Sequence, residues 1–199
     1  GGMVTTNCAV LADRLRLFRA HGISRDADKF VDKSLAFDAN GLQNPWYYQM
    51  DSPGYNYRMT EFQAALGISQ LARLDEYVAR RAQIAARYRE KLALAAHISF
   101  PVTSENVTHA WHLMVVLIDF AASGKSRARV MNELKSAQIG TQVHYIPVPM
   151  LQYYAQNNDM SNFPNSLAYY EKALSLPCFP SMSDEDVNYV ATKLIEVLS

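Results

Sequence analysis

The chain has 199 residues, of which 49% are hydrophobic and 11% aromatic, so it can build at least one packed core. Basic and acidic residues balance at 19 each, and without a basic surface we expect no nucleic-acid partner. No apolar run approaches the roughly 20 residues that span a bilayer, so we expect no membrane association.

The first sixty residues are predicted to hold little regular structure. Residues 1–6 are typical of the last piece of a strand or hairpin, and a helix follows at about 8–20 until Gly22 ends it. Residues 23–59 form a long connection with few periodic features. A loop of this length is usually functional or covered by a partner, and its aromatic run Trp46-Tyr47-Tyr48 fits either case.

A helical pattern then runs from Thr60 to about residue 96. Thr60 is a good N-cap, and Gln63 completes a capping box. The positive end and free N–H groups of such a helix suit an anion, most often a phosphate. Asn56 and Arg58 lie just before it and are placed to add two donors. From spacing alone, an amide and an arginine here more often organise the loop than bind a ligand.

This helical stretch is expected to bend near Gly67 or to break near Leu74. Its charge-rich second half, which contains Arg80, Arg81, Arg87 and Arg89, is expected to be a solvated face.

The remaining sequence alternates strand and helix, which predicts a small α/β layer. Ser183 and the acidic residues after it are typical of a helix start. In chain order we expect a strand at 111–119, a helix at 126–137 closed by Gly140, a strand at 141–145, helices at 151–156 and 165–174, an extended segment at 176–180 and a final helix from 184.

The five histidines and two cysteines show no metal-ligand spacing, so we expect no metal site. No serine or cysteine nucleophile motif is present. Cys8 and Cys178 fit either a disulfide or two buried thiols. We expect a cytoplasmic location, where two free thiols are more usual than a disulfide, and no signal peptide is found. The apolar neighbours of Cys178 predict a protonated, inert thiol.

Four segments resemble, in order and with suitable gaps, the C-terminal half of the fold-type-I, pyridoxal-phosphate-dependent nucleotide-sugar aminotransferases of the DegT/StrS group. They are residues 1–7, residues 19–22, Asn56-Tyr57-Arg58 with residues 64–71, and residues 140–147 with 175–180. The last segment is most similar to the branch that acts as UDP-4-amino-4,6-dideoxy-N-acetyl-L-altrosamine transaminase in pseudaminic acid synthesis.

The resemblance implies an α/β fold in three parts. Residues 1–59 would be the end of the large cofactor-binding domain with its long loop, residues 60–96 a connecting helix, and residues 97–199 a small C-terminal α/β domain. It also implies a homodimer whose active sites are shared between subunits.

The implied chemistry is a ping-pong transfer with pyridoxal 5'-phosphate as cofactor. An amino acid, L-glutamate, donates an amino group that passes to the 4-keto carbon of a UDP-4-keto-6-deoxy hexose derivative. The cofactor is the electron sink, and the protein orients it and moves protons.

The resemblance also assigns site residues. Asn56 would reach the cofactor phosphate of the neighbouring subunit. Arg58 would either bind a phosphate or sugar oxygen of the substrate or pair with a carboxylate at the interface. His144 and Tyr145, on opposite faces of one strand, are candidates for the substrate pocket. His21 is a further substrate candidate, although a capping or packing role is favoured.

The lysine that holds the cofactor in this family lies a few residues before the Gly-Gly strand, and here no lysine precedes Lys29. We therefore expect a fragment that lacks the catalytic lysine and is inactive alone. Two other hypotheses stay open: a sugar dehydratase of the same fold, with histidine in place of the lysine, or a non-catalytic regulatory or assembly protein.

Overall fold

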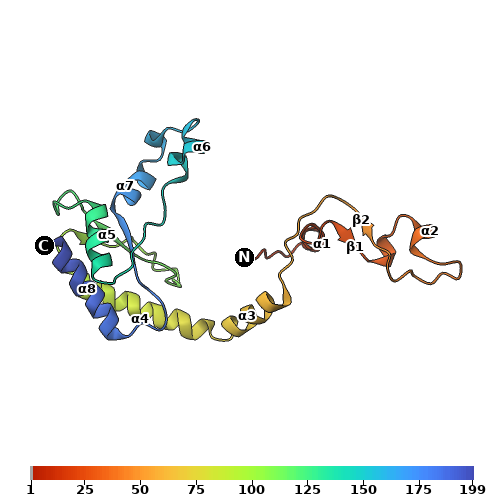
Figure 1. Cartoon of the computed structure of the whole chain (residues 1–199), viewed down its shortest axis with the longest axis horizontal. Helices are drawn as coiled ribbons and strands as arrows, with labels where there is room; N and C mark the ends of the chain where they lie inside the picture. Colours follow the sequence, from red (N-terminus) through yellow and green to blue (C-terminus); the bar gives the residue numbers. More distant parts are fainter. Residues whose placement is uncertain (1) are drawn as a thin grey trace. The chain divides into compact units, whose positions relative to one another are not determined.

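The computed structural model describes residues 2–199 and divides into two compact units, one ending at Ser69 and the other spanning Gln70–Ser199. Each unit is described by itself (Figure 1). Gly1 lies outside the described residues, and residues 2–6 form no strand, so the strand predicted at 1–6 is not found in the part that is described. The three-part division at residues 59 and 96 stays a prediction about the whole protein.

The N-terminal unit has short elements and very little buried core. Among the described residues its buried apolar side chains are Phe30 and Ala36, and Phe30 packs edge-on against Tyr47 with ring centroids 4.8 Å apart. In chain order the unit contains α1 (Ala9–Phe18), β1 (Ile23–Ser24), a 3₁₀-helix (Ala27–Lys29), α2 (Lys33–Ala36), β2 (Gln49–Met50) and the greater part of α3 (Glu61–Leu71). β1 and β2 pair antiparallel.

The predicted helical stretch from residue 60 is two helices. α3 ends at Leu71, and α4 (Leu74–Leu92) begins after a turn at Ala72 and Arg73, which confirms the expected break near Leu74. The capping box of α3 is also confirmed. The Gln63 N–H donates to Thr60 Oγ1 at 3.3 Å, and the Thr60 N–H donates to Gln63 Oε1 at 2.9 Å.

The C-terminal unit is a three-stranded antiparallel sheet in the order β3-β4-β5 with helices packed around it. α4 and α8 lie side by side, and α5 packs on α8 (Figure 1). Besides α4, the unit contains β3 (Ile98–Ser99), β4 (Met114–Ile118), α5 (Arg127–Ser136), a 3₁₀-helix (Val148–Met150), α6 (Gln152–Ala155), a second one (Met160–Asn162), α7 (Pro164–Lys172), β5 (Ala173–Leu176) and α8 (Asp184–Leu198).

Its core forms because each element offers an apolar face. β4 alternates, so Met114, Val116 and Ile118 are buried while the residues between them are half-buried. Every residue of β5 is buried. α4, α5 and α8 add one face each, with Ile84, Tyr88, Leu92, Val130, Leu134, Val187, Val190 and Leu194 among the buried residues.

The predicted strand at residues 141–145 is wrong. Only Gln142 forms a bridge, to Ser175. The next backbone N–H, of Val143, donates to the Gln142 side chain at 2.8 Å instead of to a neighbouring strand. Pro147 and Pro149 follow closely and lack N–H groups for a ladder.

Two smaller predictions also need correction. α5 is closed at Gln138, whose φ of 62° takes the left-handed conformation, and not at Gly140. The Ile139 N–H then returns to the Leu134 carbonyl at 2.9 Å, the bond that commonly ends a helix this way. The arginines of α4 are not a solvated face, because Arg80 and Arg81 reach backbone carbonyls of the segment after β5.

Candidate functional site

The segment that carries Asn56 is fixed by backbone pairing to the end of α1. The Tyr55 N–H donates to the Phe18 carbonyl at 2.6 Å, and the Tyr57 N–H donates to the Arg19 carbonyl at 2.9 Å. Asn56 itself forms an antiparallel bridge with Ala20. The segment is therefore held by main-chain bonds that do not use the Asn56 side chain.

Glycine is required where this segment crosses the end of α1. Gly22 has a φ of 72°, and a Cβ there would lie 1.7 Å from the Ser52 carbonyl oxygen. A Cβ at Gly54 would lie 2.2 Å from the Gly22 nitrogen. Only two residues without side chains allow such an approach, so both glycines place the Asn56 segment.

The side chains of Asn56 and Arg58 are exposed and available to a ligand. Tyr55 and Tyr57 stack on one side of the segment, with ring centroids 5.0 Å apart. Residues in an extended chain alternate sides, so the Asn56 carboxamide faces the other side. Among residues 2–199, neither the Asn56 carboxamide nor the Arg58 guanidinium has a hydrogen-bond partner.

His21 lies beside this segment, just after α1, and its φ of 63° is in the left-handed region. Its N–H donates to the Tyr55 carbonyl at 2.9 Å, while its ring is exposed. The backbone of His21 thus has a structural role, and its assignment to substrate stays a prediction.

His144 and Tyr145 belong to the C-terminal unit and lie together instead of on opposite faces. Their rings meet edge-on with centroids 4.8 Å apart, because the segment is not a strand. His144 is half-buried and its Nδ1 lies 2.9 Å from Ser175 Oγ, whereas Tyr145 is exposed. The sequence gives no sign of this role for Ser175, because the contact joins residues 31 positions apart.

The two rings line a cavity of about 740 Å³ in the same unit. Its walls are mainly aliphatic and aromatic, and none of the lining residues is charged. A neutral ligand part with few polar atoms fits such walls. The lining residues are Gln142, Val143, His144, Tyr145, Ile146, Val148, Leu151 and Tyr170.

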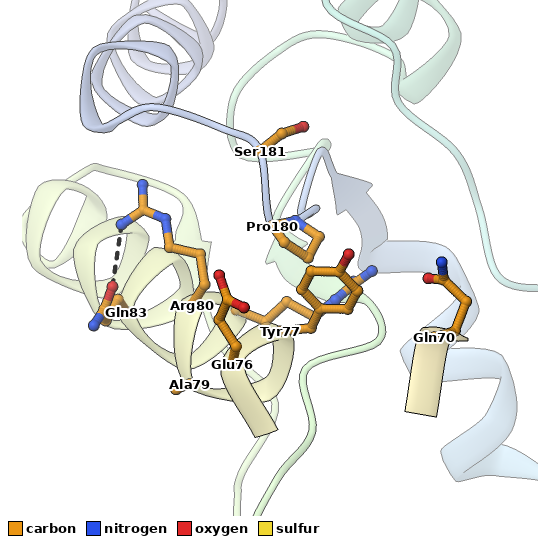
Figure 2. Close-up of a pocket in the computed structure, with 9 residues that line it drawn as sticks. Gln70, Glu76, Tyr77, Ala79, Arg80, Gln83, Pro180 and Ser181 are labelled. Atoms are coloured by element: carbon orange, nitrogen blue, oxygen red, sulfur yellow. Dashed lines mark hydrogen bonds between the residues drawn. The ribbon is translucent and has the colours of Figure 1, made fainter. Parts of the chain in front are cut away.

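A second cavity, of about 770 Å³, lies beside the first turns of α4 (Figure 2). It contains Arg80, whose guanidinium donates to Gln83, to the Met182 carbonyl at 2.6 Å and to Asp184 Oδ1 at 3.0 Å. Arg81 donates to the Cys178 carbonyl at 2.7 Å. Both guanidinium groups are thus already hydrogen-bonded within the unit. An anion would find fewer unpaired donors in this cavity than at Asn56 and Arg58.

Two lysines elsewhere in the N-terminal unit have structural contacts. Lys29 pairs with Asp26 at 3.3 Å, and Lys33 donates to the Ala27 carbonyl at 2.8 Å. Cys8 and Cys178 are free thiols, as predicted, although Cys8 is exposed instead of buried. Burial raises the pKa of the Cys178 thiol, against an opposing effect of the Arg81 charge.

Within the described chain no three histidine, cysteine or acidic side chains gather as metal ligands would. None of the helices described has the length and apolar character needed to cross a membrane.

The model of the DegT/DnrJ/EryC1/StrS aminotransferase family matches residues 1–195. The chain belongs to this family. It is 39% identical over 201 residues to the spore coat polysaccharide biosynthesis protein SpsC of Bacillus subtilis (strain 168), covering 100% of this chain and 49% of SpsC. The chain spans about half the length of the curated relatives it matches.

Solved structures confirm the predicted α/β fold class. The sugar aminotransferase Spr1654 from Streptococcus pneumoniae in its PMP form matches with a TM-score of 0.80 and 29% identity, covering 95% of this chain and 45% of that one. A PLP form of Spr1654 also matches. Helicobacter pylori PseC, an aminotransferase involved in the biosynthesis of pseudoaminic acid, has the same fold, with a TM-score of 0.81 and 23% identity over 97% of this chain and 47% of PseC.

Proposed function

We propose that the protein containing this chain is a pyridoxal-phosphate-dependent aminotransferase that transfers an amino group from L-glutamate to the 4-keto carbon of a UDP-4-keto-6-deoxy hexose derivative in the cytoplasm. Membership of the aminotransferase family supports the reaction class. The observation that carries the proposal is the Asn56–Arg58 segment, whose backbone is fixed while its amide and guanidinium stay unpaired in the described chain.

This donor set fits a phosphorylated cofactor. A carboxamide N–H₂ group donates to a phosphate oxygen without adding charge, and a guanidinium donates two parallel bonds to an anion. Asn56 would hold the cofactor phosphate, and Arg58 would hold a phosphate of the sugar nucleotide. When bound, the cofactor supplies the electron sink for amino transfer, and the protein supplies orientation.

We place the sugar at the cavity of His144 and Tyr145. Its apolar walls suit the methyl group of a 6-deoxy sugar, and the imidazole and phenol are the polar groups that orient its oxygens. His21 is a further candidate, because its ring is exposed beside the Asn56 segment.

Within the family, we propose that the protein belongs to the branch of the UDP-4-amino-4,6-dideoxy-N-acetyl-L-altrosamine transaminases, which act in pseudaminic acid synthesis. The sequence Thr141–Pro147 with Ser175–Cys178 supports this choice. The product of the reaction on each sugar nucleotide tests it, because a different branch would accept a different isomer.

We further propose a homodimer in which Asn56 of one copy reaches the cofactor of the other. α3 buries none of its residues, and its side chains Phe62, Leu66, Ile68 and Leu71 are between 63% and 90% exposed. A helix that exposes this many large apolar side chains is normally covered, and a second copy together with the rest of the protein would cover it.

A mixing experiment tests both the role of Asn56 and the sharing of sites. Protein with Asn56→Ala is combined with protein whose cofactor lysine is replaced, so that mixed dimers hold one complete site. At limiting pyridoxal phosphate we expect the lysine variant to be inactive, Asn56→Ala to have low activity and the mixture to recover transaminase activity. Absence of recovery would show that Asn56 does not act on the other subunit.

Asn40→Ala is the matched control, because its side chain is exposed and has no hydrogen-bond partner in the described chain. Asn40→Ala should leave the affinity for pyridoxal phosphate unchanged, while Asn56→Ala should lower it.

The whole protein also tests the two alternative functions. Release of water from the sugar nucleotide without consumption of glutamate would favour the dehydratase. A protein that shows no cofactor absorbance would favour the non-catalytic regulatory or assembly protein.

A further inference from the structure

Ser175 is the one buried polar residue among residues 2–199. It lies in β5, and its backbone exchanges two hydrogen bonds with Gln142, of 3.2 and 2.8 Å. This bridge brings the segment of His144 alongside β5. The imidazole Nδ1 of His144 lies 2.9 Å from Ser175 Oγ.

The position of the proton in this pair follows from the acceptors that are present. In the part of the chain that is described, the Ser175 hydroxyl has no acceptor other than His144 Nδ1. If Nδ1 carried the proton, the hydroxyl hydrogen would be buried without an acceptor, which is unfavourable. A Ser175 hydroxyl that donates to Nδ1 would avoid this cost, and in a neutral ring the proton would then lie on Nε2.

The other nitrogen of the ring, Nε2, is available to a ligand. Nε2 lies at the far edge of the imidazole from Ser175 and has no partner among residues 2–199, while the ring lines the apolar cavity. Tyr145 packs edge-on against the ring, which restricts its rotation. An N–H group in apolar walls binds an acceptor oxygen more strongly than the same group in water.

We propose that Ser175 is a positioning residue that fixes His144 as the Nε2–H tautomer and so presents a hydrogen-bond donor to an acceptor oxygen of the substrate. The ligand class is a ketone or hydroxyl oxygen on a neutral group with an apolar part, which the uncharged lining fits. The assignment of that ligand as the sugar rests on the proposed function, but the tautomer does not.

Nitrogen-15 NMR of the histidine rings tests the tautomer directly. The signals of His144 are assigned by their loss in His144→Gln. We expect the wild-type Nδ1 to show the shift of an unprotonated nitrogen and Nε2 that of an N–H. Ser175→Ala should shift both signals toward a mixture of tautomers, and Ser175→Thr, which keeps the hydroxyl, should restore them.

Ser99→Ala is the matched control, because Ser99 also lies on a strand but bonds only the Leu117 carbonyl. It should leave the His144 signals unchanged. In the whole enzyme, Ser175→Ala should raise the KM for the sugar nucleotide by about 3- to 10-fold, the loss of one neutral hydrogen bond, with the KM for glutamate unchanged. Near-ultraviolet circular dichroism checks that each variant is folded.

These measurements distinguish the positioning role of Ser175 from the substrate role of His144. An Nδ1–H tautomer in the wild type, or His144 signals that Ser175→Ala does not shift, would overturn the positioning role. If the tautomer shifts as expected but His144→Gln leaves the KM for the sugar nucleotide unchanged, the positioning stands and the proposed substrate role of His144 fails.

Discussion

The hydroxyl of Tyr88, at the centre of the C-terminal core, donates a hydrogen bond to the Pro177 carbonyl at 3.1 Å. This bond joins α4 to the segment after β5. Burial raises the pKa of Tyr88 above its ordinary value, and the nearby Cys178 and Asp186 add to the effect. The phenol therefore stays protonated, and able to donate, well into the alkaline range.

Tyr88→Phe keeps the ring packing and removes this bond. We expect the free energy of unfolding to fall by about 1–3 kcal/mol, because the Pro177 carbonyl loses its partner in a half-buried place. Urea denaturation followed by circular dichroism measures the change. Tyr153→Phe, at an exposed ring, is the control and should have no effect. An equally stable Tyr88→Phe protein would show that water replaces the phenol.

Gly22→Ala is expected to disrupt the segment that holds Asn56. The new methyl group would collide with the Ser52 carbonyl, and φ would remain in the left-handed region. Gly41→Ala separates the effect of the collision from that of the left-handed backbone. Gly41 also has a positive φ, of 80°, but has open space around it. The Gly41 variant should lose only about 1–2 kcal/mol from the backbone conformation.

Hydrogen exchange of the amides in the two chain segments that cross at Gly22 reports the effect. In Gly22→Ala the amides of His21, Tyr55 and Tyr57 should exchange faster, whereas in Gly41→Ala they should keep their protection. If these amides kept the same protection in both variants, the close approach of Gly22 to the Ser52 carbonyl would be contradicted.

The sequence predicts best those features that a few neighbouring residues determine. The capping box of Thr60 and Gln63 is confirmed, and so is the start of α8, where Ser183 and Asp186 form another box. Such boxes need only two side chains three residues apart. The helix break near Leu74 is local in the same sense. α1 ends at Phe18, before the predicted stop, and both His21 and Gly22 after it take the left-handed conformation.

Features that depend on distant pairing are missed. Ala173 and Leu174 continue a helical pattern, but they form β5 because β4 offers a complete ladder. β3 has two residues and no periodicity of its own. The same limit hides the contact of His144 with Ser175, which exists only because the Gln142 bridge brings the two segments together.

The two cysteines should differ sharply in reactivity. Cys8 is exposed, whereas Cys178 is half-buried and its thiol pKa is raised by burial. A raised pKa means less thiolate at a given pH, and the thiolate is the nucleophile. With iodoacetamide at pH 8, mass spectrometry should find Cys8 modified first and Cys178 only after unfolding. Equal labelling rates in the folded protein would contradict the burial of Cys178.

Arg58→Ala separates the two roles that the sequence leaves open for this residue. If the guanidinium binds a phosphate of the sugar nucleotide, as proposed, the KM for that substrate should rise by about 10-fold or more, because charge-assisted bonds are lost. The KM for glutamate and the oligomeric state should not change. Arg58→Lys should recover part of the affinity, since an ammonium keeps the charge without the paired geometry.

Arg25→Ala is a suitable control, because Arg25 is also an exposed arginine of the N-terminal unit. Steady-state kinetics with each substrate varied in turn, combined with size-exclusion chromatography, covers both possibilities. A variant that dissociates while the affinity of its remaining dimers for the sugar nucleotide is unchanged would assign Arg58 to an interface carboxylate. The proposed phosphate contact would then be wrong, whereas the role of Asn56 would be unaffected.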